Sequence, residues 1–297
     1  MKKILLTGKN GQVGWELQRT LMPLGQVIAL DMDELDLTDG AAIRRVVQAI
    51  RPDIIVNPAA YTAVDKAETE PALALAVNGH APGVLAEEAS KLNALLVHYS
   101  TDYIFDGTKS GAYLEDDPAN PLSVYGRTKL AGEDAVRAVG GAHLILRTSW
   151  VYGTHGRNFL LTMLRLARER RELRVVDDQI GAPTWSRTLA EITALMLAQI
   201  QVAPGSLERV CGSYHLTASG STSWFGFTSE ILRLAAIAPV PQLIPITTPE
   251  YPTPAARPMN SVLCNDKLAR VFGLAAGSWS DNLRLCMQQE SVPAPAL

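Results

Sequence analysis

The stretch KILLTGKNGQVG, residues 3–14, decides the fold. Its apolar run at residues 4–6 predicts a buried strand, and residues 12–24 continue with the apolar spacing of a helix. Between the two, Gly8, Gly11 and Gly14 keep the spacing G-x-x-G-x-x-G. Glycines at such a turn let backbone N–H groups and a helix N-terminus approach a pyrophosphate. The stretch therefore predicts the phosphate-binding turn of a dinucleotide-binding βαβ unit.

Short apolar runs and longer amphipathic runs alternate beyond this stretch. The predicted strands are 27–30, 54–56, 95–97 and 144–146, and the predicted helices are 39–50, 71–92, 123–139, 157–171, 186–201, 222–237 and 280–290. Such alternation implies a parallel sheet covered on both faces. We predict an α/β fold, a Rossmann-type doubly wound parallel sheet with a smaller C-terminal substrate-binding domain.

The pattern loosens near residue 155, which sets the predicted domain limits at 1–155 and 156–297. The predicted helix 186–201 is a candidate to pack back onto the sheet. A proline-rich stretch, 239–258, cannot form a regular helix and is expected to be an ordered loop against a site.

Composition excludes several classes of function. Of the 297 residues, 27 are Lys or Arg and 30 are Asp or Glu, so no basic balance favours a nucleic-acid partner. The longer uncharged runs are interrupted by proline or by polar residues, which argues against a membrane partner. The three cysteines are too scattered for a disulfide framework or a zinc site, and they favour a reducing, cytoplasmic setting.

Tyr125 and Lys129 form a Tyr-x-x-x-Lys pair on a predicted helix, and this spacing places both side chains on one face. An ammonium near a phenol stabilises the phenolate, so the pair predicts a tyrosine pKa lowered toward working pH and a general acid. Thr101 ends the strand before this helix, where ligands bind in open α/β sheets. Together the three residues predict carbonyl reduction by a nicotinamide cofactor, with Lys129 at its ribose.

Asp31 ends the second predicted strand, 17 residues beyond Gly14. A carboxylate at this place can bond an adenosine ribose 2′-OH and repels a 2′-phosphate, which favours NADH. Lys9 in the glycine turn could offset that repulsion and admit NADPH, so we expect both cofactors to be used. The five histidines show no ligand spacing and are expected to be structural.

These motifs resemble those of the extended short-chain dehydrogenase/reductase superfamily and, within it, the dTDP-4-dehydrorhamnose reductase family. The resemblance covers residues 3 to 290. It rests on GKNGQVG (8–14), YTAVDKAE (61–68), STDYIFDG (100–107), VYGRTK (124–129), RTSWVY (147–152), DQIGAPT (178–184), YPTPAARP (251–258) and NS (260–261). The second and seventh blocks are the most specific to the family.

The resemblance implies an NADPH- or NADH-dependent reduction of dTDP-4-dehydro-β-L-rhamnose to dTDP-β-L-rhamnose, with Tyr125 as the proton donor. The implied cofactor contacts are Gly8, Asn10, Gly11, Gln12, Val13, Gly14, Asp31, Asp36, Leu37, Ala60, Tyr61, Thr62, Tyr99 and Lys129. Thr101, Asp102 and Trp150 should contact the sugar nucleotide. Because such a substrate carries two phosphates, Arg257 in the proline-rich block is a candidate bidentate partner for them.

Two properties of the family are left open for this chain. Some members bind magnesium through acidic residues at a dimer interface, and Glu16 is a residue of that kind, but isolated acids on helices are usually solvated. We predict no metal site, and we leave both Mg²⁺ and a homodimer open.

Two other functions compete with reduction. One is a nucleotide-sugar dehydratase or epimerase on the same fold, but dehydratases usually place Asp-Glu after the threonine, and here Asp102 is followed by Tyr103. The other is a non-catalytic, NADP-binding regulatory subunit. Such proteins tend to lose the Tyr–Lys pair, which is intact in this sequence.

Overall fold

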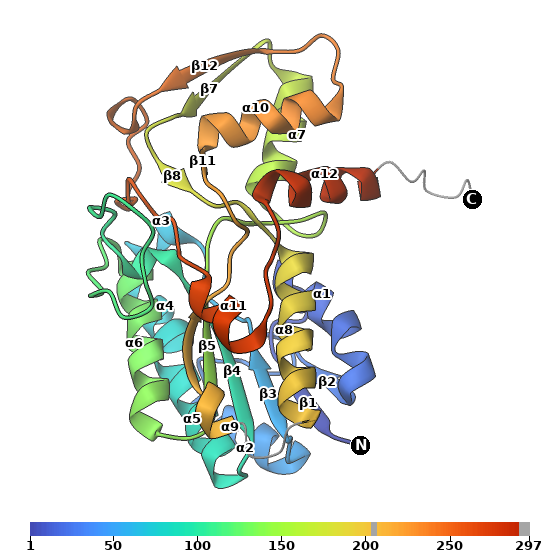
Figure 1. Ribbon diagram of the computed structural model, residues 1–297. Coiled ribbons are helices and arrows are strands. Elements are labelled where there is room, and N and C mark those ends of the chain that lie inside the picture. Colours follow the sequence, from blue (N-terminus) through green and yellow to red (C-terminus); the bar gives the residue numbers. More distant parts are fainter. Residues whose placement is uncertain (203–206, 291–297) are drawn as a thin grey trace.

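The computed structural model describes residues 1–202 and 207–290 and is built on a six-stranded parallel sheet (Figure 1). Its strand order is β10-β5-β4-β3-β1-β2, and every neighbouring pair runs parallel. The strands are β1 (Lys3–Leu6), β2 (Gln26–Ala29), β3 (Ile54–Asn57), β4 (Leu95–Thr101), β5 (His143–Thr148) and β10 (Gly212–His215). The predicted Rossmann-like α/β fold is confirmed, and β10 is a strand that the sequence analysis did not identify.

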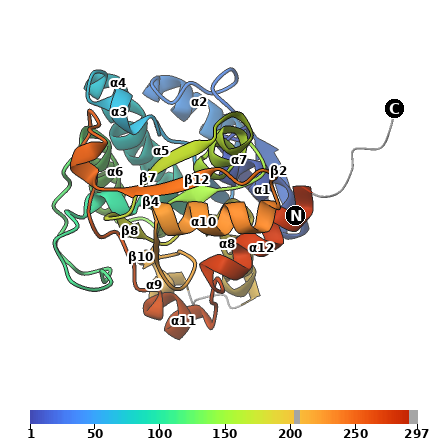
Figure 2. The same ribbon diagram turned by 90° about the horizontal axis from the view of Figure 1, so that it is seen from above.

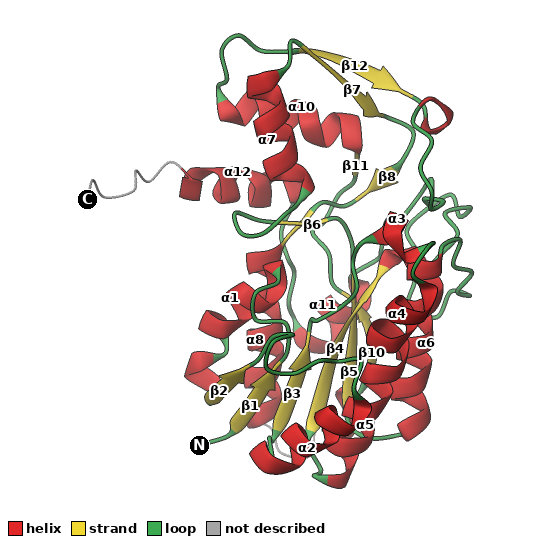
Figure 3. Ribbon diagram, turned by 180° about the vertical axis from the view of Figure 1, so that it is seen from behind, coloured by secondary structure: helices red, strands yellow, loops and turns green. Residues whose placement is uncertain are grey.

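Alternating side chains of the strands build two separate cores, one on each face of the sheet. Ile4 and Leu6 pack in one core with Leu17 of α1, whereas Leu5 packs in the other with Ile43 of α2. The first face carries α1 (Gln12–Thr20) and α8 (Ser186–Val202), and the second carries α2 (Gly40–Ile50), α5 (Ala81–Lys91) and α6 (Val124–Val139). Figure 3 shows this layering from behind. Burial on both faces explains the apolar runs 4–6, 54–56, 95–97 and 144–146 of the central strands.

A second lobe lies beyond the carboxyl ends of the strands and has its own core (Figures 1 and 2). It contains α7 (Phe159–Glu169), α10 (Trp224–Ala235), α12 (Trp279–Glu290), β7 (Glu172–Val176) and β12 (Gln242–Ile246). Helix α8 belongs by sequence to this half, yet Leu189 packs with Leu17 against the sheet. The boundary near residue 155 stays a prediction.

Part of the proline-rich stretch 239–258, which was predicted to be an ordered loop, is a strand. Residues 242–246 form β12, which pairs in parallel with β7 in a two-stranded sheet. Pro245 lies inside this strand. An edge strand tolerates proline because the missing N–H faces away from its only partner.

The predicted helix 71–92 is divided by a π-helical turn at Ala76–His80 into α4 (Pro71–Leu75) and α5. Asn78 lies in that turn, and its side-chain amide bonds both the N–H and the carbonyl of Tyr61, at 2.8 and 3.1 Å. Such turns occur frequently at functional sites. Through Asn78, the π-helical turn fixes the position of the segment that follows β3.

The remaining elements are short. They are η1 (Met22–Leu24), α3 (Val64–Ala67), η3 (Asp102–Ile104), β6 (Val151–Tyr152), β8 (Ile180–Gly181), β9 (Thr184–Trp185), α9 (Leu207–Val210), β11 (Thr222–Ser223), η4 (Thr248–Glu250) and α11 (Asp266–Phe272). Within the described ranges, no helix combines the length and apolar character that a bilayer crossing needs.

Candidate active site

A cavity of about 720 Å³ opens at the carboxyl edge of the sheet, where the loops after β1 and β3 diverge. Strand order places β2 on one side of β1 and β3 on the other, so this is the point at which the chain reverses its direction of winding. Ligands of open α/β sheets bind at such a point. We call this the first cavity.

The glycine turn, residues 8–14, lines the first cavity. Gly8 has φ +60°, and a Cβ atom on Gly14 would stand 2.0 Å from the carbonyl oxygen of Gly8. Helix α1 begins at Gln12, so its N-terminal amides face the space that the missing side chains leave. Two buried oxygens that border the cavity, Oε1 of Gln12 and Oγ1 of Thr148, have no hydrogen-bond partner among the described residues. Both features fit a polar dinucleotide.

The structure brings all of the predicted cofactor-binding residues to this one cavity. Its lining includes Gly8, Asn10, Gly11, Gln12, Val13, Gly14, Asp31, Asp36, Leu37, Ala60, Tyr61, Thr62, Tyr99 and Lys129. Tyr125 lines it as well. Their contacts with a cofactor stay predictions.

Lys9, which was predicted to offset the repulsion between Asp31 and a 2′-phosphate, pairs with an acidic residue in this structure. Its Nζ bonds both carboxylate oxygens of Glu34, at 2.6 and 2.7 Å. Asp31 accepts a hydrogen bond from the N–H of Asn10 at 2.8 Å, which ties the end of β2 to the glycine turn. Arg157, which also lines the cavity, is a cation in this region that the sequence analysis missed.

The proposed proton donor and its lysine lie on consecutive turns of α6. Lys129 is 2% exposed, and its Nζ donates to the carbonyl of Tyr99 at 2.6 Å. Thr101 is buried at the end of β4, and its hydroxyl donates to Asp102 at 2.9 Å. The Ser123 side chain caps α6 by accepting from the N–H of Gly126 at 3.2 Å. The helix start thereby fixes where Tyr125 stands.

Desolvation dominates the electrostatics of this pair. It raises the pKa of Tyr125 to about 12, although a hydrogen bond with Thr101 acts in the opposite direction. It lowers the pKa of Lys129 to about 8, and the charge of Glu133 partly offsets this effect. The predicted lowering of the tyrosine pKa is wrong in direction: burial raises this pKa, and the interaction that opposes burial is the hydrogen bond with Thr101. Tyr125 is consequently a protonated acid at neutral pH.

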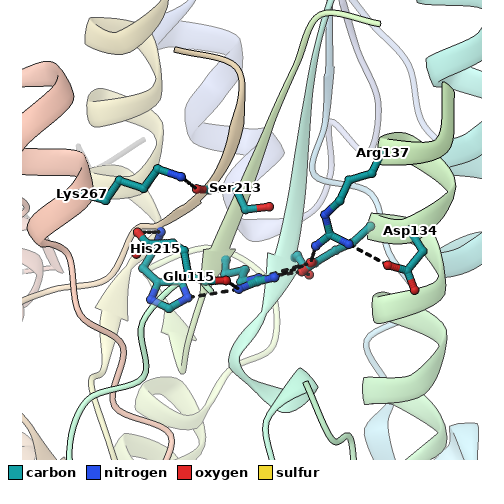
Figure 4. A network of polar contacts seen from close by, with 9 residues as sticks. Glu115, Asp134, Arg137, Ser213, His215 and Lys267 are labelled. Atoms are coloured by element: carbon teal, nitrogen blue, oxygen red, sulfur yellow. Dashed lines mark hydrogen bonds and ion pairs between the residues drawn. The ribbon is translucent and has the colours of Figure 1, made fainter. Parts of the chain in front are cut away.

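A polar network centred on the buried Glu133 lies next along α6, and Figure 4 shows part of it, with Arg137 and Asp134 labelled. Glu133 follows Lys129 by one turn of α6, is fully buried, and accepts from Ser100 Oγ at 2.5 Å and from Arg147 Nη2 at 2.8 Å. Arg137 also contacts Glu133 and reaches Asp134 at 2.7 Å. The network joins α6 to β4 and β5, so it fixes the helix that carries the Tyr–Lys pair against the strand that carries Thr101.

A second cavity, of about 480 Å³, opens between the sheet and the second lobe. Arg257 and Tyr103 both line it, and the ring of Tyr103 meets that of Tyr125 edge-on with centroids 5.6 Å apart. Tyr103 therefore lies between the two cavities. It was not predicted as a site residue, and the one sequence signal for it is its position next to Asp102. Arg170 and Arg174 add positive charge to the second cavity. An anionic ligand fits this lining.

The other predicted substrate residues lie near the two cavities without lining either one. Trp150 stacks on Trp224 with ring centroids 3.5 Å apart, and it covers Gly181 so closely that a Cβ atom there would meet the indole. Asp102 is buried, which raises its pKa to about 7, and its Oδ2 has no partner in the described part of the chain. Their roles stay predictions.

Glu16 and His98 both have partners within the protein. Glu16 pairs with Arg19 at 2.8 Å, and His98 bonds Asn57 at 3.1 Å inside the sheet. Across the described ranges, no group of three or more His, Cys, Asp or Glu side chains is placed to hold a metal ion.

The fold and the site together define the class of protein: a short-chain dehydrogenase/reductase with a Rossmann-type cofactor domain. Within this class the chain belongs to the family described as "RmlD substrate binding domain", whose model matches residues 1–292. The resemblance stated from the motifs is confirmed.

Named relatives agree along almost the whole chain. The dTDP-4-dehydrorhamnose reductase of Burkholderia thailandensis is 49% identical over 292 residues, which is 96% of this chain and 98% of that protein. The enzyme of the same name from Escherichia coli is 46% identical over 294 residues, covering 96% and 97%. The crystal structure of dTDP-4-dehydrorhamnose reductase from Bacillus anthracis in complex with NADP superimposes with a TM-score of 0.90 at 36% identity, covering 97% and 99%.

More distant structures share the fold alone. A UDP-glucose 4-epimerase from Thermus thermophilus in complex with NAD has a TM-score of 0.81 at 20% identity. Likeness at this level does not separate a reductase from an epimerase.

Proposed function

We propose that this protein reduces the C4 carbonyl of dTDP-4-dehydro-β-L-rhamnose with NAD(P)H to give dTDP-β-L-rhamnose. This is the last step of dTDP-L-rhamnose synthesis for cell-surface polysaccharide such as O antigen. The single observation that carries the proposal is that Tyr125 and Lys129 line the same cavity as the glycine turn. The high identity to reductases of that name supports the choice of substrate.

The residues of the first cavity suit a bound NAD(P)H. The amides at the start of α1 would hold the pyrophosphate, and Asp31 would bond the adenosine ribose. Lys129 would bond the nicotinamide ribose from its place beside the Tyr99 carbonyl. When bound, the cofactor supplies a hydride to the carbonyl carbon of the substrate.

Tyr125 completes the reduction. As the carbon gains its hydride, the C=O π electrons move to oxygen, and this oxygen takes the proton of the Tyr125 hydroxyl. A developing alkoxide is a stronger base than a phenolate, so a tyrosine whose pKa is raised to about 12 can still donate. The Lys129 ammonium stabilises the phenolate that remains until water returns the proton.

The second cavity would hold the nucleotide part of the substrate, with Arg257 at the phosphates. Thr101, Asp102 and Trp150 would then contact the sugar. We also propose two domains, over residues 1–155 and 156–297, with helix α8 packing on the first domain. Residues 291–297 lie outside the described residues. A cytoplasmic location and a homodimer belong to the same proposal, and light scattering on the purified protein tests the dimer.

Turnover of purified protein tests the proposed function. We expect stoichiometric loss of NAD(P)H absorbance with dTDP-4-dehydrorhamnose, and slower loss with other 4-keto sugar nucleotides. A dehydratase, and most epimerases, return their hydride and would show no net loss. A regulatory subunit would bind NADPH and consume none. Either of these last two results would overturn the proposal.

A further inference from the structure

An acidic residue of the N-terminal half holds the arginine of the second cavity. Asp65 lies on α3, and Arg257 lies in the proline-rich stretch, 192 residues later in the chain. The Nη1 and Nη2 atoms of Arg257 donate to the two carboxylate oxygens of Asp65, at 2.7 and 2.8 Å. This two-pronged geometry is the strong form of a carboxylate–guanidinium contact. The pair also lowers the pKa of Asp65, so the carboxylate is ionised at neutral pH.

Backbone contacts reinforce the same arrangement. Nη1 of Arg257 also donates to the carbonyl of Ala255 at 2.6 Å, and the N–H of Ala255 donates to Asp65 at 3.2 Å. The hydroxyl of Thr253 lies 3.2 Å from Nη1. The loop at 253–257 is thus folded around a single guanidinium nitrogen, with α3 as its anchor.

One edge of the guanidinium is left over. Arginine has five N–H donors in a planar fork. The contacts above occupy the end of the fork, the Nη1–Nη2 edge. No acceptor among the described residues bonds Nε, and Nη2 has one further hydrogen. The Nε–Nη2 edge can therefore take two oxygens of an anion while Asp65 keeps the adjacent Nη1–Nη2 edge.

The surroundings favour a phosphate for that edge. Arg257 is 18% exposed and lines the second cavity, which also carries Arg170 and Arg174. Asp65 is 43% exposed at the same cavity, so its charge alone would repel an anionic ligand. If Asp65 acts by orienting Arg257, it strengthens the binding of a diphosphate. If it acts mainly by repelling the phosphates, it weakens that binding.

We propose that Asp65 is a positioning residue that fixes Arg257 so that its Nε–Nη2 edge receives the diphosphate of the nucleotide substrate. The inference rests on the proposed function and deepens it. Asp65 acts through Arg257 and touches neither the carbonyl nor the hydride, so it governs substrate binding and not the chemical step.

The test is Asp65→Asn, which keeps the size of the side chain and removes the charge. We expect KM for the sugar nucleotide and the dissociation constant of dTDP, measured by calorimetry, to rise roughly tenfold, as for the loss of a charge-assisted contact. We expect kcat to stay within about twofold and the dissociation constant of thymidine, which lacks phosphate, to stay unchanged. Asp65→Glu should recover part of the loss in dTDP binding.

Glu230→Gln is the matched control. Glu230 also bonds an arginine with both oxygens, at 2.6 and 2.7 Å to Arg233, but it lies on α10 outside the cavity lining. This variant should leave all constants unchanged. A general loss of folding in Asp65→Asn would weaken thymidine and dTDP alike, which would overturn the positioning role.

Tighter dTDP binding by Asp65→Asn would also overturn the inference, because it would make the carboxylate a competitor of the phosphates. Unchanged dTDP binding would do the same. These outcomes are separate from the proposed function, since calorimetry with dTDP needs no turnover. If the wild-type protein reduced no 4-keto sugar nucleotide, the function would fail while the dTDP measurement still decided the role of Asp65.

Discussion

Lys129 donates a hydrogen bond from Nζ to the backbone carbonyl of Tyr99 at 2.6 Å, which joins helix α6 to the end of strand β4. The ammonium is held at the first cavity with almost no contact with solvent. Burial disfavours its charged form, and the pKa is lowered to about 8. The charge that we propose to stabilise the Tyr125 phenolate is thus itself sensitive to pH.

A pH profile of the enzyme tests this relationship. Because the folded protein holds the pKa of Lys129 near 8, the lysine is protonated below that pH and loses its charge as the pH rises through it. We expect kcat/KM to fall across this range, since the phenolate left by Tyr125 loses its counter-charge. Lys129→Met should be slow and should lack this step. A wild-type profile that stays flat to well above pH 8 would contradict the assignment.

Glu133→Gln tests the buried network behind the pair. The substitution leaves Arg147, which is buried, without its carboxylate partner. Breaking one side of a buried pair costs about 3–5 kcal/mol, so the free energy of unfolding in denaturant should fall by that amount. Asp134→Asn on the same helix is the control: Asp134 is 65% exposed, and its loss should cost less than about 1 kcal/mol. Equal losses in the two variants would show that the network adds no stability.

Gly14→Ala tests the glycine turn. A Cβ atom would stand 2.0 Å from the Gly8 carbonyl oxygen, so the turn must move away from its phosphate-binding shape. Such overpacking costs about 1–3 kcal/mol, which predicts a roughly 5- to 150-fold weaker affinity for NADPH. At Gly111 an added Cβ meets nothing within 4 Å, and Gly111→Ala should bind NADPH as the wild type does. NADPH fluorescence titration measures both, and equal affinities would remove the turn from cofactor binding.

Features that are local in the sequence could be predicted. The strand, glycine turn and helix of residues 3–14 follow one another directly, and Tyr125 and Lys129 share a helix face through their spacing alone. The glycine spacing and the apolar runs therefore predicted a doubly wound parallel sheet and the edge of this sheet at which the first cavity lies.

Features that depend on distant partners could not be predicted. Strand β12 contains Pro245, and only its pairing with β7 makes an extended strand there. The ion pair of Asp65 and Arg257 joins segments 192 residues apart. Nothing near Arg257 in the sequence indicates an acidic partner.

Charge effects also required the fold. The spacing of Tyr125 and Lys129 predicts that the two side chains are neighbours. It does not indicate how far they are buried from water. Desolvation reversed the expected direction of the tyrosine pKa. Lys9 was likewise expected beside a cofactor phosphate, and its partner proved to be Glu34.

Tyr125→Phe tests the central claim most directly. The substitution removes only the hydroxyl that we propose as the proton donor, so steady-state turnover of dTDP-4-dehydrorhamnose should fall by roughly 10²–10⁴, the usual contribution of a positioned acid. NADPH affinity, measured on the same preparation, should stay within about twofold of the wild type. Wild-type turnover in Tyr125→Phe would contradict the account.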